Sequence, residues 1–291
     1  MSWKRLIRFI PSSGPSGPLI GEPVDAALDV GLASLADPGS IAAAIFSGSS
    51  VLSPGERTGE IRNVSRLLSP LAQSEVGTIR CIGINYLRHA EEVKMEIPKQ
   101  PVLFMKPETS LNDPYPAKVP IPHQFAADDA CDYESEVAVV IGKEAKNVTE
   151  ADAMEYCLGL TASNDVSQRV AQFAQSQWCF SKSFDGACPI GPALVNVKDI
   201  EDIASMKIKG ILNGQVVQEG GLDDLIFSIP KIVSFLSQGT TLKPGTLILT
   251  GTPFGVGWTR SPRLTLKDND EVRVEVSSGV GTLINRFVVE E

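Results

Sequence analysis

Short apolar runs bounded by turn residues dominate the chain from about residue 78 onward, and runs of this kind predict strands. An entirely apolar stretch at 137–141 is typical of a strand that is buried on both faces. Asn213-Gly214 separates two such runs and predicts a tight hairpin. The other predicted strands cover 78–86, 101–107, 158–167, 189–195, 206–212, 215–220, 246–253, 270–276 and 281–290.

Helical patterns are fewer than strand patterns. Residues 223–239 form the longest predicted helix, and Gly239 supplies its stop signal. A second helix is predicted over 149–159, where Thr149 and Asp152 match a capping box. Because strands and helices do not alternate regularly, a Rossmann fold or a TIM barrel is disfavoured, and the pattern indicates an α+β fold that is mainly β. Short helices are also predicted at 86–95 and 167–175.

The beginning of the chain has weaker periodicity and many small residues. We therefore expect a small N-terminal domain (1–75) before a larger one (76–291). Within it, a strand is predicted at 4–10, and a short helix after the turn at Asp37-Pro38-Gly39. The proline-rich residues 112–125 predict a long irregular loop.

Composition and charge narrow the classes of function. The net charge of −9 and the pI of about 4.9 argue against sequence-independent nucleic-acid binding and against an anionic membrane surface. No apolar stretch reaches the roughly 18 residues of a transmembrane helix. Five widely spaced cysteines without a C-x-x-C pair indicate reduced thiols in an intracellular compartment. We expect a cytoplasmic protein, with a mitochondrial location left open by the basic start of the chain.

Carboxylates occur at every second position just before the apolar run at 137–141. Side chains at i and i+2 of a strand share a face, so Glu134 and Glu136 would lie about 7 Å apart and repel each other beside a buried core. A hard cation with oxygen ligands would relieve this repulsion, which predicts Mg²⁺, or else Mn²⁺ or Ca²⁺. Asp165, at the end of another apolar strand, would complete the site. The alternatives are a solvated strand end, with Asp132 also exposed, and helix capping by Asp165.

Three other segments carry candidate chemistry. His89 and Glu92 face each other at i, i+3 if their segment is helical, and a carboxylate beside a histidine suits a general base. Lys182 lies between apolar residues and could stabilise developing negative charge. The loop at 250–257 offers backbone N–H groups to an anion. The alternatives are an exposed polar pair, an ordinary surface lysine and a plain turn.

Eight stretches in order resemble the fumarylacetoacetate hydrolase family, from Ile79 to the C-terminus. They are GINYLRHAEE, PVLFMKP, DYESEVAVVIG, NDVSQR, SKSFDGACPIGP, LNGQVVQ, FSIPKIVSFLS and LTGTPFGVG. The resemblance implies an α+β, mainly β fold, with a mixed β-roll as the C-terminal domain, a small N-terminal domain and a homodimer. Total length, the N-terminal region and residues 166–185 look closer to the oxaloacetate tautomerase subgroup.

The resemblance also implies a site. The family's metal ligands, which typically hold Mg²⁺, match Glu134, Glu136 and Asp165. Its catalytic His–Glu pair matches His89 and Glu92, on a segment that often closes over substrate. Its catalytic lysine matches Lys182. The family's substrate-binding positions match Thr252, Arg169, Gln172 and Lys106.

The implied activity is Mg²⁺-dependent hydrolysis of a C–C bond in a 1,3-dicarbonyl substrate, either an acylpyruvate or a fumarylacetoacetate-like compound. His89 and Glu92 would activate water, and the leaving group would be an enolate held on the metal. Two alternatives stay open: an oxaloacetate tautomerase or decarboxylase with the same site, and a non-catalytic metal-binding homologue. Members that cleave acylpyruvates or decarboxylate oxaloacetate often show GRNY, where this chain has GINY. Because Ile84 cannot pair with a substrate carboxylate, this departure disfavours a small dicarboxylate handled in their way.

Overall fold

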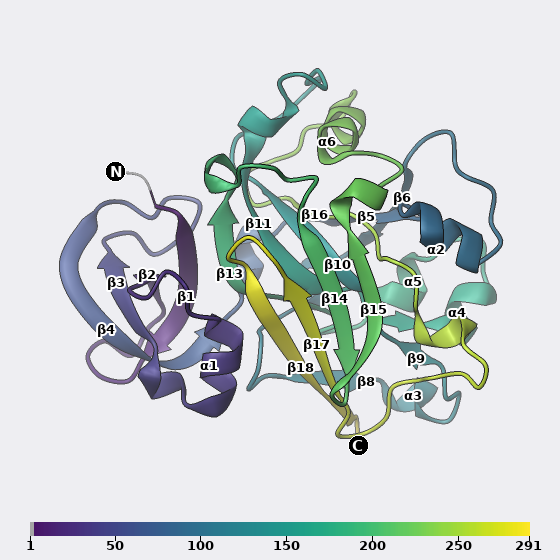
Figure 1. The fold of residues 1–291 in the computed structure, drawn as a ribbon, viewed down its shortest axis with the longest axis horizontal. Helices are drawn as coiled ribbons and strands as arrows, with labels where there is room; N and C mark the ends of the chain where they lie inside the picture. Colours follow the sequence, from purple (N-terminus) through teal and green to yellow (C-terminus); the bar gives the residue numbers. More distant parts are fainter. Residues whose placement is uncertain (1–2) are drawn as a thin grey trace.

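The computed structural model describes residues 3–291 and is mainly β with a few short helices, as predicted (Figure 1). The strands are β1 (Arg5–Pro11), β2 (Leu19–Pro23), β3 (Ala42–Phe46), β4 (Arg57–Leu68), β5 (Ile79–Gly83), β6 (Val102–Lys106), β7 (Leu111–Asn112), β8 (Lys118–Ile121), β9 (Cys131–Asp132), β10 (Ser135–Ile141), β11 (Cys157–Asn164), β12 (Ser167–Gln168), β13 (Cys188–Asn196), β14 (Lys207–Leu212), β15 (Gln215–Gly221), β16 (Leu247–Leu249), β17 (Glu271–Val276) and β18 (Gly281–Val289). The α-helices are α1 (Val30–Ala36), α2 (Leu87–Glu92), α3 (His123–Ala126), α4 (Arg169–Phe173), α5 (Cys179–Lys182) and α6 (Ile229–Ser237). Within residues 3–291, no helix has the length and apolar character needed to cross a membrane.

Three sheets organise these strands. The largest has eleven strands, in the order β2-β3-β4-β1-β13-β11-β10-β16-β5-β6, with β7 added beside β13. A five-stranded sheet has the order β15-β14-β17-β18-β8, and β9 pairs with β12. Most neighbours are antiparallel, but β5 with β16, β7 with β13, and β8 with β18 are parallel. The architecture is therefore mixed, as expected for a β-roll.

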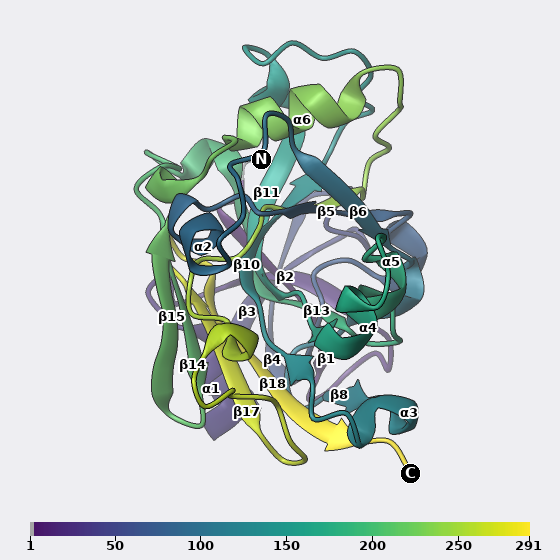
Figure 2. The same cartoon turned by 90° about the vertical axis from the view of Figure 1, so that its right-hand side faces the viewer.

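Two cores enclose the central strand β10. Val137 and Val139 belong to the main core, which also contains apolar residues of β14, β17 and β18 in the five-stranded sheet. Ala138 and Val140 point into a second core with residues of β5 and β16. The predicted burial of this strand on both faces is confirmed. The helices α2, α4 and α5 lie at the end of the molecule away from β1–β4 (Figure 1, right; Figure 2, facing the viewer).

Strands β1–β4 and α1 form a group at one side of the molecule (Figure 1, left), with a small core of their own. The group is continuous with the large sheet because β1 pairs with β13, placing Arg5 opposite Val195 and Leu6 opposite Leu194. A domain boundary near residue 75 stays a prediction.

Gly31→Ala is expected to weaken the attachment of this N-terminal group. A Cβ at Gly31 would lie 1.7 Å from the backbone oxygen of Thr282 on β18, so helix and strand would have to separate. We expect a loss of about 1–3 kcal/mol in the free energy of unfolding, measured by urea denaturation. Gly17→Ala is the matched control because no atom lies within 4 Å of its Cβ position. Equal stability of the two variants would contradict the prediction.

The predicted helix after Asp37 is wrong: α1 precedes the turn and β3 follows it. Asp29 caps α1, since its carboxylate accepts hydrogen bonds from the amides of Gly31 and Leu32. Ala42–Phe46 pair with both β2 and β4, and this pairing overrides the helix propensity of three successive alanines.

Three other local predictions need correction. Residues 149–159 contain only a 3₁₀ turn at Ala153–Tyr156, because Cys157 already begins β11 and its pairing with β10. The longest helix, α6, is shorter than predicted and starts after the capping Ser228. The proline-rich segment 112–125 contains β8 and α3, since β8 pairs with β18. The hairpin is confirmed: Asn213 and Gly214 have φ of 49° and 83°.

Candidate active site

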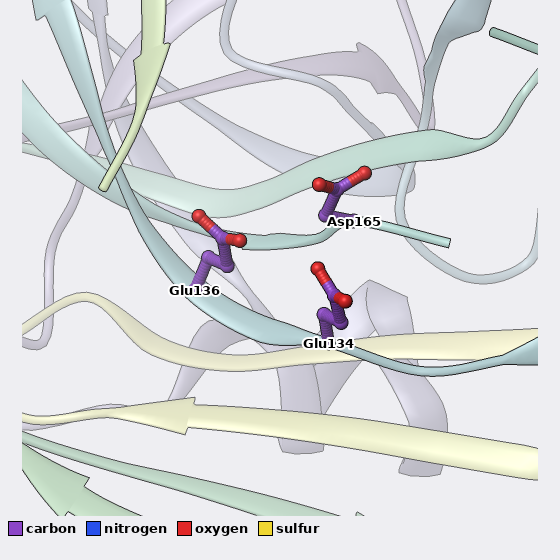
Figure 3. A group of neighbouring side chains, drawn as sticks. All are labelled: Glu134, Glu136 and Asp165. Atoms are coloured by element: carbon purple, nitrogen blue, oxygen red, sulfur yellow. The ribbon is translucent and has the colours of Figure 1, made fainter. Parts of the chain in front are cut away.

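The acidic cluster lies where two neighbouring strands of the large sheet meet. β10 and β11 pair with Ser135 opposite Asn164, so Glu134 and Asp165 flank the same end of the pair. The amide of Asp165 donates a hydrogen bond to the carbonyl oxygen of Glu134 (2.9 Å). Carboxylate oxygens of Glu134, Glu136 and Asp165 lie within 4.8 Å of one another, and all three residues are buried (Figure 3). The structure thus brings together the three predicted metal ligands.

Cationic side chains contact two of these carboxylates. Lys182 Nζ lies 2.6 Å from Glu134 Oε2 and 2.9 Å from Asp165 Oδ2. Lys106 Nζ lies 2.6 Å from Asp165 Oδ1, and Arg169 Nη1 lies 2.7 Å from Glu134 Oε1. Burial raises the pKa of Glu134, but the charges of Lys182 and Arg169 outweigh it and lower the pKa to about 2. Glu134 is therefore ionised at neutral pH.

Fewer cationic side chains stabilise Glu136 than stabilise Glu134 or Asp165. Its Oε2 accepts a hydrogen bond from the amide of Gly251 (2.6 Å), and it makes no ion pair among residues 3–291. Burial, followed by the charges of Asp165 and Glu134, raises the pKa of Glu136 well above its usual value. A divalent cation would remove this unfavourable energy, and three carboxylates form a donor set that hard cations prefer. The residues therefore fit the predicted ion.

Lys182, at the end of α5, has a buried ammonium group between two carboxylates. Burial lowers the pKa of Lys182, but Asp165 and Glu134 raise it more, so the net shift is upward and the side chain stays charged. Its Nζ also lies 4.9 Å from the centre of the Phe104 ring. A fixed positive charge at this position can offset negative charge that develops on a substrate. This role stays a prediction.

Lys106, predicted as a substrate-binding residue, lies behind Asp165. Its ammonium group is buried, pairs with Asp165 and donates to the carbonyl oxygen of Ala187 (2.8 Å). It is not part of the cavity wall described below. We therefore propose that Lys106 neutralises and positions Asp165 rather than contacting substrate.

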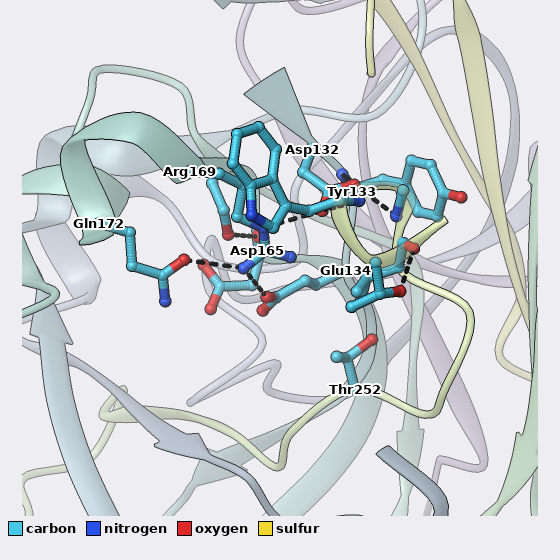
Figure 4. Close-up of polar contacts among 12 residues, drawn as sticks. Asp132, Tyr133, Glu134, Asp165, Arg169, Gln172 and Thr252 are labelled. Carbon is cyan, nitrogen blue, oxygen red and sulfur yellow. Dashed lines mark hydrogen bonds and ion pairs between the residues drawn. The ribbon is translucent and has the colours of Figure 1, made fainter. Parts of the chain in front are cut away.

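Arg169, the first residue of α4, is fixed by three neighbours (Figure 4). Its Nε donates to Asp132 Oδ2 (2.8 Å), and its Nη1 donates to Gln172 Oε1 (2.9 Å) and pairs with Glu134. Its Nη2 is buried and has no hydrogen-bond partner in the described part of the chain. Arg169 lines the cavity, but this unpartnered Nη2 is itself closed off from solvent.

Asp132 is fully buried, which contradicts the alternative of an exposed residue. Besides holding Arg169, it accepts hydrogen bonds from the amides of Gly257 (2.8 Å) and Trp258 (3.0 Å). It does not continue the alternation of the two glutamates because β9 ends at Asp132 and β10 begins only at Ser135. Asp132 therefore ties Arg169 to the loop that follows β16, a role that sequence reasoning missed.

His89 and Glu92 lie on one face of α2, as the i, i+3 spacing predicts. His89 Nδ1 is 2.9 Å from Glu92 Oε2. The other carboxylate oxygen of Glu92 accepts hydrogen bonds from the amide of Gly255 (2.9 Å) and the hydroxyl of Thr259 (2.7 Å). Burial raises the pKa of Glu92, but these hydrogen bonds outweigh it, so the net pKa is lowered. The pair has the geometry of an oriented general base.

Thr259→Val is expected to raise the pKa of Glu92 because it removes one hydrogen bond to the ionised form. The folded-state pKa lies below the usual 4.5, so the stability that Glu92 contributes is present at neutral pH and is lost as pH falls through the folded pKa. In the variant this loss begins at a higher pH. Acid unfolding measures the shift, and Thr259→Ser, which keeps the hydroxyl, should behave as wild type. Identical acid midpoints for the valine and serine variants would refute the contribution of Thr259.

Thr252 follows β16, and its hydroxyl is held by protein groups. The hydroxyl donates to the carbonyl oxygen of Ser135 (2.9 Å) and accepts from Gln218 Nε2 (2.8 Å). The same Gln218 side chain accepts from the amide of Ser135 (2.9 Å). The hydroxyl of Thr252 can therefore offer only an acceptor to a substrate. Gln218 was missed because its burial depends on how β15 packs, which its polar side chain does not indicate.

One cavity of about 400 Å³ unites most of the predicted residues. Those that line it are His89, Glu92, Glu134, Glu136, Arg169, Gln172, Lys182 and Thr252. Apart from Ile84, sequence reasoning missed its apolar wall, because such residues resemble ordinary core residues. That part of the wall includes Ile84, Phe104, Phe173, Trp178 and Trp258.

Buried carboxylates, a hydrogen-bonded His–Glu pair and buried cationic side chains around one cavity are features of an enzyme active site. The family model described as "Fumarylacetoacetate (FAA) hydrolase C-terminal" matches residues 78–288, so the chain belongs to the fumarylacetoacetate hydrolase family.

Relatives and solved structures support this assignment. The chain is 43% identical to caffeoylpyruvate hydrolase of Neonothopanus nambi, over 100% of this chain and 95% of the relative. It is 38% identical to a mitochondrial oxaloacetate tautomerase of Homo sapiens, over 78% of this chain and 71% of that protein. A crystal structure of 5-carboxymethyl-2-hydroxymuconate delta-isomerase from Mycobacterium smegmatis has a TM-score of 0.80 and 30% identity, over 98% of this chain and 100% of that one. The chain is therefore an enzyme, and the alternative of a non-catalytic homologue is not supported.

Proposed function

We propose that this enzyme hydrolyses a C–C bond in an acylpyruvate, a 1,3-dicarbonyl acid, with a divalent cation as cofactor. The observation that carries the proposal is that the carboxylates Glu134 and Glu136 line the same cavity as the His89–Glu92 pair. A cation site beside an oriented base suits a reaction in which water attacks a carbonyl group and an enolate leaves. The activity of the relative from Neonothopanus nambi belongs to the same reaction class.

The three carboxylates of the acidic cluster would hold the cation, and Mg²⁺ is our first choice because all the ligands are oxygen atoms. When bound, the cation would supply a Lewis acid beside the substrate oxygens. Lys182, which contacts Glu134 and Asp165, would keep these ligands in place and add positive charge.

The proposed reaction begins with proton transfer to His89 and ends with cleavage of the C–C bond. His89, oriented by Glu92, takes a proton from water, and the water oxygen bonds to the acyl carbonyl carbon. The bond from that carbon to the adjacent CH₂ then breaks, and its electron pair stays with the pyruvate fragment. Protonation of the CH₂ carbon yields pyruvate, and the acyl fragment leaves as a carboxylic acid.

The substrate carboxylate has a natural partner in Arg169. Its Nη2 donor is unpartnered but closed off from solvent, so a small local rearrangement would bring it to a substrate carboxylate, while Asp132 and Gln172 hold the rest of the guanidinium. A carboxylate that accepts from this donor would be oriented in the cavity at little entropic cost to the protein. Gln172 would then act mainly by holding Arg169.

A panel of 1,3-dicarbonyl acids tests the proposal. We expect release of pyruvate in the presence of Mg²⁺, measured with a coupled dehydrogenase, and loss of that release after EDTA treatment. Addition of Mg²⁺ should restore the rate. Absence of cleavage of every acylpyruvate tested would refute the proposal.

Oxaloacetate tautomerisation is the second candidate, favoured by the 38% identity to the human tautomerase. Moving a proton between carbon and oxygen needs an acid–base group and charge stabilisation, but no attacking water. Enol-to-keto conversion of oxaloacetate, followed by ultraviolet absorbance, measures this activity. A rate no higher than that without enzyme would exclude it, and pyruvate release from oxaloacetate would instead indicate decarboxylation.

We also propose that the chain forms a homodimer. The edge strand β6 exposes Leu103 and Met105, and α4 exposes Val170. Exposed apolar patches of this kind often mark protein interfaces. Sedimentation velocity should give the mass of a dimer, and a monomer mass at micromolar concentration would contradict the proposal. A cytoplasmic or mitochondrial location stays a prediction.

A further inference from the structure

Aromatic side chains form a large part of the cavity wall. Two of the chain's three tryptophans, Trp178 and Trp258, line the cavity together with Phe104 and Phe173. Aromatic residues make up only 6% of the chain, so four of them in the wall of one cavity are more than this composition would give by chance. Phe173 is 69% exposed, so packing of the protein core does not account for its position.

The first aromatic pair adjoins Lys182 of the charged cluster. Phe104 lies 4.9 Å from Lys182 Nζ on one side and meets Trp178 edge-on, with ring centroids 5.7 Å apart and an interplanar angle of 69°. The ring of Trp178 is packed against Gly83, where a Cβ would come within 2.3 Å of the indole. Along this part of the wall, the ammonium group of Lys182 is followed by the ring of Phe104 and then by the indole of Trp178.

The second aromatic pair lies beside the proposed carboxylate partner. Phe173 and Trp258 are stacked, with centroids 6.1 Å apart and an interplanar angle of 23°. The backbone amide of Trp258 donates to Asp132, which also holds Arg169. Asp132 thus holds both the guanidinium of Arg169 and the backbone of Trp258.

Ile84 adds a strained apolar residue to the wall. Its φ of 52° lies in the left-handed region, which is unfavourable for a β-branched side chain. The next residue, Asn85, holds the backbone there: its side chain donates to the carbonyl oxygens of Phe227 (3.1 Å) and Thr250 (2.7 Å) and accepts from the Phe227 amide (2.8 Å). Strain maintained in this way is typical of functional sites.

We propose that the substrate's acyl substituent is a planar aromatic ring, conjugated or directly bonded to the carbonyl that water attacks. This inference rests on the proposed acylpyruvate hydrolase function. The carboxylate end meets Arg169, and the ring lies against the wall formed by Phe104 and Trp178. Aromatic pairs of this kind favour a flat apolar group over an aliphatic chain of similar length.

A substituent with a distal carboxylate is the main competing choice. Lys94 also lines the cavity, but it is exposed to solvent, and an exposed ion pair adds little affinity. A second carboxylate would be unfavourable beside the four aromatic rings and Ile84. Binding there would remove the carboxylate from water, and this part of the wall offers it no buried partner.

Three acylpyruvates that differ in their acyl group test the inference. Benzoylpyruvate carries a ring, acetylpyruvate a methyl group, and fumarylpyruvate a distal carboxylate. We expect kcat/KM for benzoylpyruvate to exceed that of either other compound by at least about tenfold. A preference for acetylpyruvate or fumarylpyruvate would overturn the inference while leaving the proposed function intact.

Variants identify the residues that recognise the ring. Trp178→Leu is expected to lower kcat/KM for benzoylpyruvate about tenfold, mainly through KM, and to leave that for acetylpyruvate within about twofold of wild type. Phe180→Leu is the matched control, because Phe180 is an exposed aromatic residue on α5 outside the cavity wall. Equal losses for both substrates in Trp178→Leu would argue against ring recognition.

A binding measurement separates the inference from the proposed function. Phenylpyruvate, a 2-oxo acid with a ring but no second carbonyl, should bind at least about tenfold more tightly than pyruvate by isothermal titration in the presence of Mg²⁺. If no acylpyruvate is cleaved but phenylpyruvate is preferred, the hydrolase proposal fails and the aromatic site stands. Equal affinity for the two acids would overturn the aromatic site.

Discussion

Replacing Glu136 with glutamine is expected to eliminate stoichiometric Mg²⁺ binding and to lower kcat for acylpyruvate cleavage by about 10²–10³-fold. The carboxylate is one of three that converge within 4.8 Å, and the amide that replaces it carries no charge to attract the ion. A Lewis acid at such a site contributes several kcal/mol of charge stabilisation, which sets this expected loss. Isothermal titration should give one ion per wild-type chain and none per variant chain.

The same substitution should have the opposite effect on the ion-free protein. Burial and the charges of Asp165 and Glu134 raise the pKa of Glu136, so its ionised form destabilises the folded state at neutral pH. Glutamine removes that repulsion, and the ion-free variant should unfold at the same or a higher temperature than ion-free wild type. Saturating Mg²⁺ should then raise the melting temperature of wild type only.

Glu271→Gln on β17 serves as the matched control for Glu136→Gln. Glu271 pairs with Arg273 and Arg286 and lies outside the cavity wall, so its loss should leave Mg²⁺ binding and activity unchanged. Unaltered Mg²⁺ stoichiometry in Glu136→Gln would refute the assignment of the metal site. A variant that binds no Mg²⁺ but keeps full activity would instead refute metal dependence.

Local patterns predicted most strands because each strand carries its own signal. The apolar run of β10 and the Asn213-Gly214 turn are read correctly from a few residues. Helices were less predictable where pairing between distant segments decided the outcome. Ala42–Phe46 form β3 because β2 and β4 flank them, and nothing within the segment itself indicates those partners.

The same distinction between local signals and long-range interactions applies to the candidate site. Charged residues in strand-end positions stand out in sequence, and Glu134, Glu136 and Asp165 are indeed neighbours in the structure. Asp132 and Gln218 were missed because their importance comes from hydrogen bonds to residues far along the chain. Their positions follow from the packing of loops, which the sequence does not encode locally.

Replacing His89 with glutamine is expected to lower kcat for acylpyruvate cleavage by about 10²–10⁴-fold while leaving Mg²⁺ binding intact. His89 forms a hydrogen bond with Glu92 and lines the cavity, but it forms no hydrogen bond or ion pair with the acidic cluster that we propose as the metal site. Loss of activity without loss of the ion would therefore assign His89 to proton transfer. The chain has only one other histidine, His123 on α3, so His123→Gln is a matched control that should retain wild-type activity.

The His89 variant also separates the two candidate functions. Cleavage requires an activated water, so hydrolysis should fall by the full amount when the base is lost. Tautomerisation of oxaloacetate also needs an acid–base group but no attacking water, so solvent can supply part of the proton transfer. Lys182 and the proposed cation site, which would stabilise the enolate charge, are unchanged in the variant. If hydrolysis is the main activity of the enzyme, the ratio of its hydrolysis rate to its tautomerisation rate should drop at least about tenfold in His89→Gln. An unchanged ratio would mean that one proton-transfer step limits both reactions, and cleavage within about tenfold of wild type would remove His89 from the mechanism.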